Sequence, residues 1–476
     1  MTLWEERIAA TRVVFGESLE HLGWRPAGDS EFESVVQMGE SEHHIRIQLG
    51  PDFPFTPPRV FPPLDTPASW HRELDGAMCL YPEVGRGSLP WLDAADLCAT
   101  INLWLQATDH GWPADAPDMD LERYFEPLDE MSLVIYDERM DKLVDRLVRF
   151  NVEGPRIVLA GAGARPRKSN RRRNRLYGYI TDIGEPERPP RGWEDLISLL
   201  DDEAASTLVG RADRGDIDLL MLRYSRKGAV GAVALFLVQD GLGFQLRSVP
   251  SASIAHSTLA LRGGHDVQSL GAKRVLVVGA GSIGSFICDY LARSGVGSLT
   301  IRDPDVLRPG NSVRHLVASQ FAGFPKVTAI KYVLDQRPGS TTEVEVDTRS
   351  LRDAFEVPEL LAEYDLVIDA SADGAASAML ADAARTLGVH IVSASLQNEG
   401  RIVRADVIPP VRGEPIPAVE LDATVAKLVF EAGCGDPVSM TPPYAANEAA
   451  SLAARLAIDL LLRPASVAAG TVHAYI

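Results

Sequence analysis

The sequence predicts a chain of three parts, the last of which is a doubly wound α/β domain. From residue 263 onward, short apolar runs rich in β-branched residues alternate with helical patterns, which is typical of a parallel sheet covered by helices. The first run, Val275–Val278, leads directly into a G-x-G-x-x-G turn and a helical pattern. One hydrophobic core rarely grows beyond ~250–300 residues, so 476 residues require several domains. We expect boundaries near residues 150 and 262.

The first 150 residues carry the pattern of an α+β domain. A helix is predicted over 3–22, alternating strands over 31–49, an extended proline-rich segment over 53–63 and a second helix over 92–107. Residues 151–262 hold strand patterns at 156–160, 219–222 and 232–237, and we interpret them as a small connecting domain without a catalytic constellation. In residues 263–476, strands are predicted at 274–278, 298–302, 342–346, 365–369 and 390–393.

Composition and charge exclude several classes of protein. A formal charge of -19 argues against nucleic acid as the main partner. The sequence contains no run of ~18 apolar residues, so no membrane span is predicted. The N-terminus lacks the basic start and apolar core of a signal peptide, and we therefore expect a cytoplasmic protein. The four cysteines form no C-x-x-C pair, which disfavours a zinc site or a disulfide framework. Cys98 and Cys288 lie within helical patterns and are expected in the core.

The glycine turn predicts a nucleotide site of a Rossmann-like fold. Its three glycines allow a tight turn and close approach of phosphate to a helix N-terminus, and Asp303 lies where an acid can bind ribose. A polar loop with further candidate ligands follows. An acid, an amide and two cations suit ATP chemistry better than hydride transfer, although an NAD-dependent oxidoreductase stays open as an alternative. The candidate nucleotide ligands are Gly279, Gly281, Gly284, Asp303, Asn311, Arg314 and Lys326.

These residues resemble the adenylation domain of the ThiF, MoeB and ubiquitin-activating family. The family pattern runs D-x-D-x-V, S-N-x-x-R-Q and G-x-x-K; here Gly310 replaces the usual Ser and His315 the usual Gln. The resemblance implies ATP and Mg²⁺ as cofactors, Asp303 on the ribose, and Asn311, Arg314 and Lys326 on the triphosphate. It also implies that Arg314 and Lys326 act in catalysis, because attack of a carboxylate on the α-phosphate builds negative charge that fixed donors must meet.

The magnesium ligand departs from the family pattern. The family's fourth strand ends in a motif like D-C-T-D-N, whose second Asp binds the metal. Here the stretch is Asp369-Ala370-Ser371-Ala372-Asp373, so Ala372 stands at the metal position and Asp373 follows one residue later. We expect Asp373 to bind the metal after a small loop shift, with a helix cap as the alternative role.

Cys434 is the first candidate nucleophile. It lies between Gly433 and Gly435, in a loop before a long apolar helical pattern over 444–462. A thiol in such a place is accessible and can be activated by a helix end or nearby cations. Its position is similar to that of the thiol which accepts the activated carboxylate in ubiquitin-activating enzymes, whereas sulfur-carrier activators such as MoeB need no such thiol.

Cys79 is the second candidate nucleophile. The stretch Asp52–Val60, then His71, Gly76–Leu80 and Trp91, resembles the signature of ubiquitin-conjugating enzymes over roughly residues 10–112. The resemblance makes Cys79 the thioester-forming residue. Arg72-Glu73 replaces the family's Pro-Asn, so the Asn that supports the oxyanion is absent and another donor or a partner protein must substitute.

The expectation is therefore a fusion of a ubiquitin-conjugating-like domain with a ThiF-type adenylation domain. Such fusions resemble conjugation proteins of bacterial antiphage (CBASS-type) operons. The resemblance implies adenylation of the C-terminus of a ubiquitin-like protein, or of another partner such as an antiphage nucleotidyltransferase. A thioester relay through Cys434 and Cys79 to a target lysine follows. Homodimerisation is expected by analogy.

Two alternatives remain at this stage. One is a ThiF/MoeB-like adenylyltransferase that serves a sulfur-carrier protein and has an inactive N-terminal domain. The other is an oxidoreductase or a non-catalytic nucleotide-binding scaffold. The oxidoreductase leaves Asn311, Arg314 and Lys326 without roles.

Overall fold

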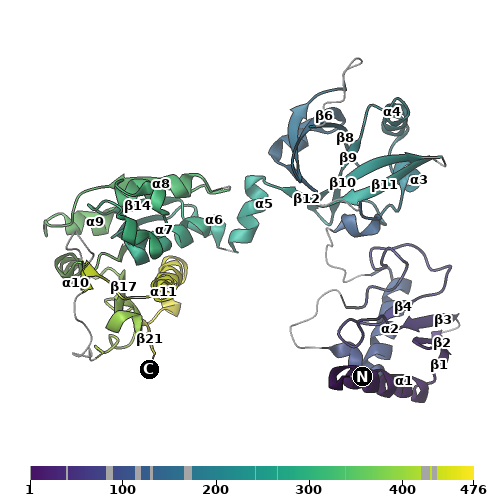
Figure 1. Ribbon diagram of the computed structural model, residues 1–476, viewed down its shortest axis with the longest axis horizontal. Helices are drawn as coiled ribbons and strands as arrows, with labels where there is room; N and C mark the ends of the chain where they lie inside the picture. The colour runs from purple at the N-terminus through teal and green to yellow at the C-terminus, as the bar shows by residue number, and fades with distance from the viewer. Residues whose placement is uncertain are drawn as a thin grey trace. The chain divides into compact units, whose positions relative to one another are not determined.

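The computed structural model describes residues 2–38, 41–81, 89–112, 120–128, 132–165, 174–241, 243–264, 266–337, 339–419, 429–430 and 437–475. The chain divides into two compact units, Met1–Ser253 and Ile254–Ile476, which are coloured purple to teal and teal to yellow in Figure 1. No helix within the described ranges is long and apolar enough to span a lipid bilayer.

The first unit begins with two helices and a four-stranded antiparallel sheet (Figure 1). The Thr2 side chain accepts from Glu5 N and the Glu5 carboxylate accepts from Thr2 N, a capping box that starts α1, while Asp93 caps α2. Apolar side chains of both helices and the sheet share one core. The elements are α1 (Leu3–His21), β1 (Arg25–Gly28), β2 (Glu31–Met38), β3 (Ser41–Gln48), β4 (Arg59–Phe61) and α2 (Ala94–Asp109).

A second sheet of eight strands completes the first unit, in the order β11-β10-β9-β8-β6-β7-β5-β12. Parallel strands β8 and β9 are joined through two helices, as parallel pairing requires a crossover. The elements are β5 (Leu133–Tyr136), β6 (Arg146–Glu153), β7 (Arg156–Ala162), β8 (Arg175–Asp182), α3 (Trp193–Ser198), α4 (Asp202–Asp213), β9 (Leu219–Arg226), β10 (Ala229–Asp240), β11 (Gly243–Val249) and β12 (Ser251–Ser253).

The expected boundary near residue 150 differs from this arrangement. Residue 150 lies inside β6, which pairs with β7 and β8, and β5 already belongs to the same sheet. Sequence patterns missed β5 because a four-residue strand leaves little periodicity. The second unit likewise begins at Ile254, nine residues before the expected boundary at 263. Residues 133–253 thus form a full eight-stranded sheet rather than a small connection.

The second unit is a seven-stranded sheet in the order β15-β14-β13-β16-β17-β18-β21. The first five strands in this order run parallel, and β18 and β21 pair antiparallel. All five predicted strands are confirmed, with ends within a few residues of those expected. The strands are β13 (Arg274–Val278), β14 (Ser298–Arg302), β15 (Glu343–Asp347), β16 (Leu366–Asp369), β17 (Ile391–Gln397), β18 (Ile402–Ile408) and β21 (Gly470–Ala474); a short pair, β19 (Val429–Phe430) and β20 (Pro437–Val438), lies apart.

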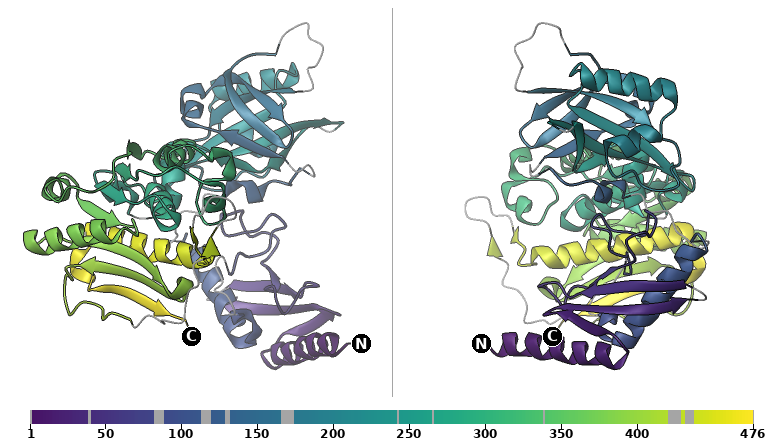
Figure 2. Two further views of the ribbon diagram at one scale, coloured as in Figure 1. Left: turned by 60° about the vertical axis from the view of Figure 1, so that its left-hand side comes forward. Right: turned by 90° about the vertical axis from the view of Figure 1, so that its right-hand side faces the viewer.

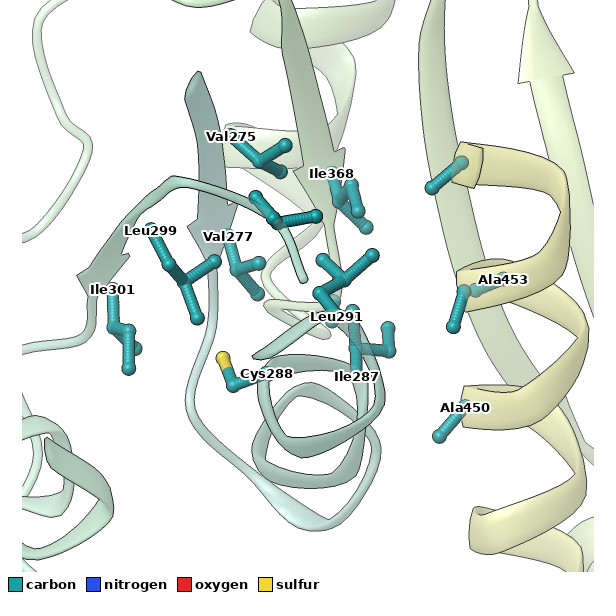
Figure 3. Packing of buried hydrophobic residues seen from close by; sticks show 14 of the residues in the cluster. Val275, Val277, Ile287, Cys288, Leu291, Leu299, Ile301, Ile368, Ala450 and Ala453 are labelled. Carbon is teal, nitrogen blue, oxygen red and sulfur yellow. The ribbon is translucent and has the colours of Figure 1, made fainter. Parts of the chain in front are cut away.

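Helices cover both faces of this sheet. On one face, α7 and the alanine-rich α11 pack on valine, leucine and isoleucine side chains of the strands; the Cys288 sulfur points into this core (Figure 3). On the other face, α9 and α10 pack on alternate residues of the same strands, which include Leu276 and Val278. The helices are α5 (His256–Ala260), α6 (Val267–Leu270), α7 (Ser282–Arg293), α8 (Lys326–Asp335), α9 (Val357–Glu363), α10 (Gly374–Leu387) and α11 (Pro443–Leu462).

This topology decides where a ligand can bind. Strands β13, β14 and β16 are parallel neighbours, so their carboxyl ends lie at one edge of the sheet, where open α/β folds bind ligands. Helix α7 starts at that edge, and Figure 2 shows α11 lying along the sheet of the same unit in both views.

Candidate functional site

The glycine turn after β13 is closely packed at two of its three glycines. Gly279 has φ +98°, and a Cβ there would lie 2.5 Å from the Ala370 backbone. A Cβ on Gly284 would lie 1.9 Å from the Gly279 carbonyl oxygen. A Cβ on Gly281, the residue before α7, would meet no described atom within 4 Å. The first and third glycines therefore allow the turn itself, and the second leaves open space beside the helix N-terminus, where an anion can bind.

Asp303 connects the turn to the next strand. Its side chain is nearly buried, with Oδ2 accepting from Ala280 N at 2.7 Å and Oδ1 accepting from Asp305 N at 2.8 Å. Lys326, the first residue of α8, places its Nζ 2.8 Å from Asp305 Oδ2 and 4.0 Å from Asp303 Oδ1. The structure therefore brings the glycine turn, the expected ribose ligand and one expected phosphate ligand to one place.

His315 holds the same turn from its other side. Its Nδ1 accepts from Val317 N at 3.1 Å, so its Nε2 carries the proton and donates to the Ala280 carbonyl at 2.7 Å. Because Asp303 accepts from the N–H of Ala280 and His315 donates to its C=O, both backbone polar groups of this residue are held. In the sequence, His315 stands only as a departure from the Gln of the family pattern. A Gln side-chain amide also carries one donor group and one acceptor group, so His315 can make the same two hydrogen bonds.

We expect His315 to make stability depend on pH. Burial lowers its pKa, Lys326 lowers it further, and Asp303 and the Ala280 carbonyl oppose this. The unfolded chain therefore binds the proton more readily than the folded one. The contribution of neutral His315 to the free energy of unfolding is complete above the pKa of the unfolded chain, near ~6.5. It is lost as the pH falls through the pKa of the folded chain, with a slope of at most ~1.4 kcal/mol per pH unit. Urea unfolding from pH 8 to pH 5 should show this loss in the wild type.

His315→Gln is the matched variant for this measurement. It keeps a donor and an acceptor but does not titrate, so its stability should fall less between pH 7 and pH 5 than that of the wild type. Equal slopes in the two proteins would show that His315 does not titrate on unfolding.

Arg314 and Asn311 lie in the polar loop, where each side chain bonds to backbone atoms. Arg314 Nη1 donates to the carbonyls of Ser439 and Thr441 at 3.0 Å each, just before α11, and burial lowers its pKa. Asn311 lies in a 3-10 helix, η5 (Pro309–Val313), where its Oδ1 accepts from Arg308 N at 2.9 Å. The cation and the amide expected on the triphosphate are thus engaged with the backbone here.

Asp373 caps α10, as the alternative role predicted. Its Oδ1 accepts from Ala375 N at 2.9 Å and Ala376 N at 3.3 Å, and these bonds hold its pKa below the usual range. Arg352 lies 3.6 Å from its other oxygen. Among the residues that the structure describes, no group of three or more His, Cys, Asp or Glu could hold a metal ion. Magnesium often uses only one or two carboxylates plus phosphate oxygens, so its ligand stays a prediction.

Two buried charges, Asp369 and Arg302, have no role predicted from the sequence. Asp369, at the end of β16, accepts from the hydroxyls of Ser371 at 2.7 Å and Ser377 at 2.5 Å. Arg302, at the end of β14, donates to Glu356 at 2.7 Å and is almost fully buried. Their bonds hold the carboxyl ends of β16 and β14, after which the loops of the candidate site begin. Their partners follow 8 and 54 positions later in the chain, so only the fold reveals the pairs.

The thiols have different surroundings. Cys288 is fully buried and its pKa is raised by burial, which confirms its place in the core. Cys98 is half-buried, and its sulfur accepts from Trp24 Nε1 at 3.2 Å. Cys79 is also half-buried; burial and Glu73 raise the pKa of its thiol, and Arg123 lowers it. Cys434 lies outside the described residues.

The fold and the site define a nucleotide-binding α/β domain with acidic and basic groups beside a glycine turn. Residues 255–414 match the model of the ThiF family. The second unit therefore contains a ThiF family domain of the α/β adenylation type, and the rest of the chain lies outside that match.

Curated relatives align over a similar length. The chain is 37% identical over 133 residues to "Adenylyltransferase and sulfurtransferase uba4" of Aspergillus clavatus, covering 27% of this chain and 26% of the relative. It is 36% identical over 130 residues to "Adenylyltransferase and sulfurtransferase MOCS3" of Arabidopsis thaliana, covering 27% and 28%. The chain thus spans about a quarter of the length of the curated relatives it matches.

Solved structures also align with the chain. The E. coli MccB structure with ATP is 18% identical and covers 41% of this chain and 57% of its own, with a TM-score of 0.32. The E. coli tRNA N6-threonylcarbamoyladenosine dehydratase TcdA, in complex with AMP, is 19% identical and covers 44% and 94%, with a TM-score of 0.34.

Proposed function

We propose that the second unit is an ATP-dependent adenylyltransferase. It joins AMP to the C-terminal carboxylate of a partner protein, either a ubiquitin-like protein or a sulfur carrier. The observation that carries this proposal is the connected set of glycine turn, Asp303 and Lys326 in a domain that matches the ThiF family. Relatives that align over about 130 residues are named adenylyltransferases, which supports the same activity.

The residues of the site fit ATP with Mg²⁺. Gly281 leaves open space at the α7 N-terminus for phosphate, and the Asp303 carboxylate lies beside it for the ribose. Asp373 is the candidate carboxylate that would hold Mg²⁺, and the metal would supply positive charge to offset that of the phosphates. Lys326 and Arg314 would turn from Asp305 and from the Ser439 and Thr441 carbonyls toward the phosphates.

The reaction makes one bond and breaks one bond. A carboxylate oxygen attacks the α-phosphorus, the bond to the β-phosphate bridging oxygen breaks, and pyrophosphate leaves. Negative charge grows on the α-phosphate and on the leaving group as this happens. Lys326, Arg314 and Asn311 would supply donors for that charge once they face the phosphates, and donors held at that place stabilise a transition state more than a ground state.

The proposal is tested by ATP–pyrophosphate exchange. The full chain is incubated with ATP, Mg²⁺ and a candidate carrier protein that ends in Gly-Gly, and with the same protein lacking its last glycine. We expect exchange with the first and little with the second. Binding of NAD in place of ATP, with hydride transfer and no exchange, would overturn the proposal in favour of an oxidoreductase.

A second candidate function adds a thioester relay to this adenylation. In it the first 150 residues are a ubiquitin-conjugating-like domain, and the acyl group passes to Cys434, then to Cys79 and finally to a target lysine. The observation that favours it is the charged setting of Cys79, between Glu73 and Arg123. The names of the relatives, which pair adenylyltransferase with sulfurtransferase, favour a sulfur carrier instead, with an inactive first domain. The antiphage setting and homodimerisation belong to the relay proposal.

Thioester adducts separate these two candidates. The full chain is incubated with ATP, Mg²⁺ and an accepted partner, and adducts that a reductant removes are measured on the wild type, Cys79→Ala and Cys434→Ala. The relay predicts a loss of the final adduct in Cys79→Ala and of all adducts in Cys434→Ala. Adenylate without any thioester adduct in the wild type would leave the sulfur-carrier function.

A further inference from the structure

Cys79, in the first unit, lies among charged side chains that come from other parts of the fold. We infer that Glu73 and Arg123 are catalytic partners of Cys79 in acyl transfer. In this assignment Glu73 accepts the thiol proton, and Arg123 binds the oxyanion that forms on the acyl carbonyl. The inference deepens the proposed relay and rests on it. It assigns a donor to the place left open by Arg72-Glu73, where the ubiquitin-conjugating signature has Pro-Asn.

A tight hairpin presents Glu73 and Cys79 to each other. Arg72 and Met78 pair across it as an antiparallel bridge, Glu73 N donates to the Ala77 carbonyl at 2.8 Å, and Cys79 N donates to the His71 carbonyl at 2.9 Å. Glu73 and Cys79 therefore leave opposite arms of one hairpin, and the Glu73 carboxylate is close enough to the thiol to raise its pKa.

The hairpin is held from both sides. The Arg72 guanidinium crosses it and donates to the Gly76 carbonyl at 3.0 Å and to the Thr66 carbonyl at 2.5 Å. Arg191, which precedes α3 of the second sheet, donates to the Glu73 carbonyl at 3.2 Å. Bonds of this number to one short loop fix the backbone from which the Glu73 carboxylate extends.

Arg123 reaches the thiol from a different element. It lies in a 3-10 helix, η2 (Leu121–Tyr124), and its Nη2 donates to the Trp70 carbonyl at 2.9 Å and to the Tyr124 hydroxyl at 2.8 Å. Trp70 and Tyr124 are themselves buried in one aromatic cluster with Tyr224. The guanidinium is thus oriented by a rigid core, beside the residue that precedes His71, the hairpin partner of Cys79, and it lowers the pKa of the Cys79 thiol.

The two charges act on the thiol in opposite directions. Burial and Glu73 raise the Cys79 pKa, and Arg123 lowers it, with a net rise. Burial and Glu73 therefore favour the protonated thiol in the free chain. A base in contact with the thiol is then required for attack at neutral pH, since the thiolate is the nucleophile.

The step balances with these groups alone. As a bond forms between Cys79 Sγ and the carbonyl carbon of an acyl thioester, the thiol proton passes to Glu73 and the carbonyl oxygen becomes an oxyanion beside Arg123. The oxyanion then collapses, the bond to the donor sulfur breaks, and Glu73 returns the proton to the leaving thiolate. No oxidant or metal is needed.

The test uses a small thioester so that no protein partner is required. The full chain carrying Cys434→Ser is incubated with the glycine thioester of mercaptoethanesulfonate, and glycylation of the Cys79 peptide is followed by mass spectrometry. Alkylation of Cys79 by iodoacetamide is measured in parallel, because this reaction reports only the thiolate fraction. The Cys98 peptide, from the same digest, reports any loosening of the fold.

The two rates should separate in the variants. In Glu73→Gln, loss of the negative charge should speed alkylation at pH 7, while loss of the base should slow glycylation by about tenfold or more. In Arg123→Gln both rates should fall, and Arg123→Lys should recover part of each. The matched controls Glu31→Gln and Arg46→Gln, an ion pair on β2 and β3, should leave both rates unchanged.

Proportional changes in the two rates for Glu73→Gln would overturn the assignment, because Glu73 would then only set the thiolate fraction. Glu73→Asp is the second variant if Glu73→Gln loosens the fold, and it should retain part of the glycylation rate; a glycylation rate for Glu73→Asp that follows alkylation would likewise overturn the assignment. The probe needs no ATP. Failure here therefore leaves the adenylation proposal standing, and failure of pyrophosphate exchange leaves this result unaffected.

Discussion

Lys326→Ala should lower the rate of ATP–pyrophosphate exchange by about 100- to 1,000-fold, the effect of removing one fixed donor from a developing anion. Lys326 Nζ lies between Asp303 and Asp305, so removing it also leaves two carboxylates near the nucleotide without their cation. The effect should fall mainly on kcat, because growing charge in the transition state gains most from the lysine.

Lys331→Ala is the control for this change. Lys331 lies on the same helix, α8, but pairs with Asp335 and donates to the Val344 carbonyl, away from the turn. Its exchange rate should match the wild type. A Lys326→Ala protein with a normal kcat and only a raised KM for ATP would place this residue in ground-state binding and contradict the proposed role.

Gly284→Ala should destabilise the second unit and abolish nucleotide binding. A methyl group there would lie 1.9 Å from the Gly279 carbonyl oxygen, a contact that only a backbone shift can relieve. Overpacking of this kind costs about 1–3 kcal/mol, and the shift would move Ala280 away from Asp303 and His315. Thermal unfolding with and without ATP and Mg²⁺ measures both effects.

Gly281→Ala separates structure from ligand binding at the same turn. A methyl group on Gly281 meets no described atom within 4 Å, and its φ of -79° suits alanine, so stability without nucleotide should stay close to that of the wild type. The stabilisation by ATP should fall, because the methyl group would occupy the space beside the helix N-terminus. Equal losses of intrinsic stability in the two variants would contradict this division of roles.

Much of the second unit could be predicted because its signals are local. Short apolar runs, as in β13, or alternating apolar residues, as in β15, marked the parallel strands, and the glycine turn marked where the first strand meets a helix. The match to the ThiF family over residues 255–414 agrees with that pattern. The start of the eight-stranded sheet was harder to predict from the sequence, since β5 is four residues long and pairs with strands from later in the chain.

The residues of the candidate site could likewise be predicted only in part. Asp303 and Lys326 were predicted and lie together at the turn, whereas Asn311 and Arg314 are engaged with the backbone and Asp373 caps a helix. The hydrogen bond from His315 to the Ala280 carbonyl could not be predicted, because it depends on which backbone atom of Ala280 faces the imidazole.

The sequence by itself determined the α/β class of the second unit, its strands, its glycine turn and the thiol at position 79, since each is encoded by neighbouring residues. Only the tertiary structure decided that Asp303 and His315 hold the backbone of Ala280 and that Arg123 acts on the Cys79 thiol. Each of these pairs joins residues from different elements, Arg123 and Cys79 being 44 positions apart in the chain. A side chain acquires a partner at that separation through the packing of whole elements, and no local pattern records it.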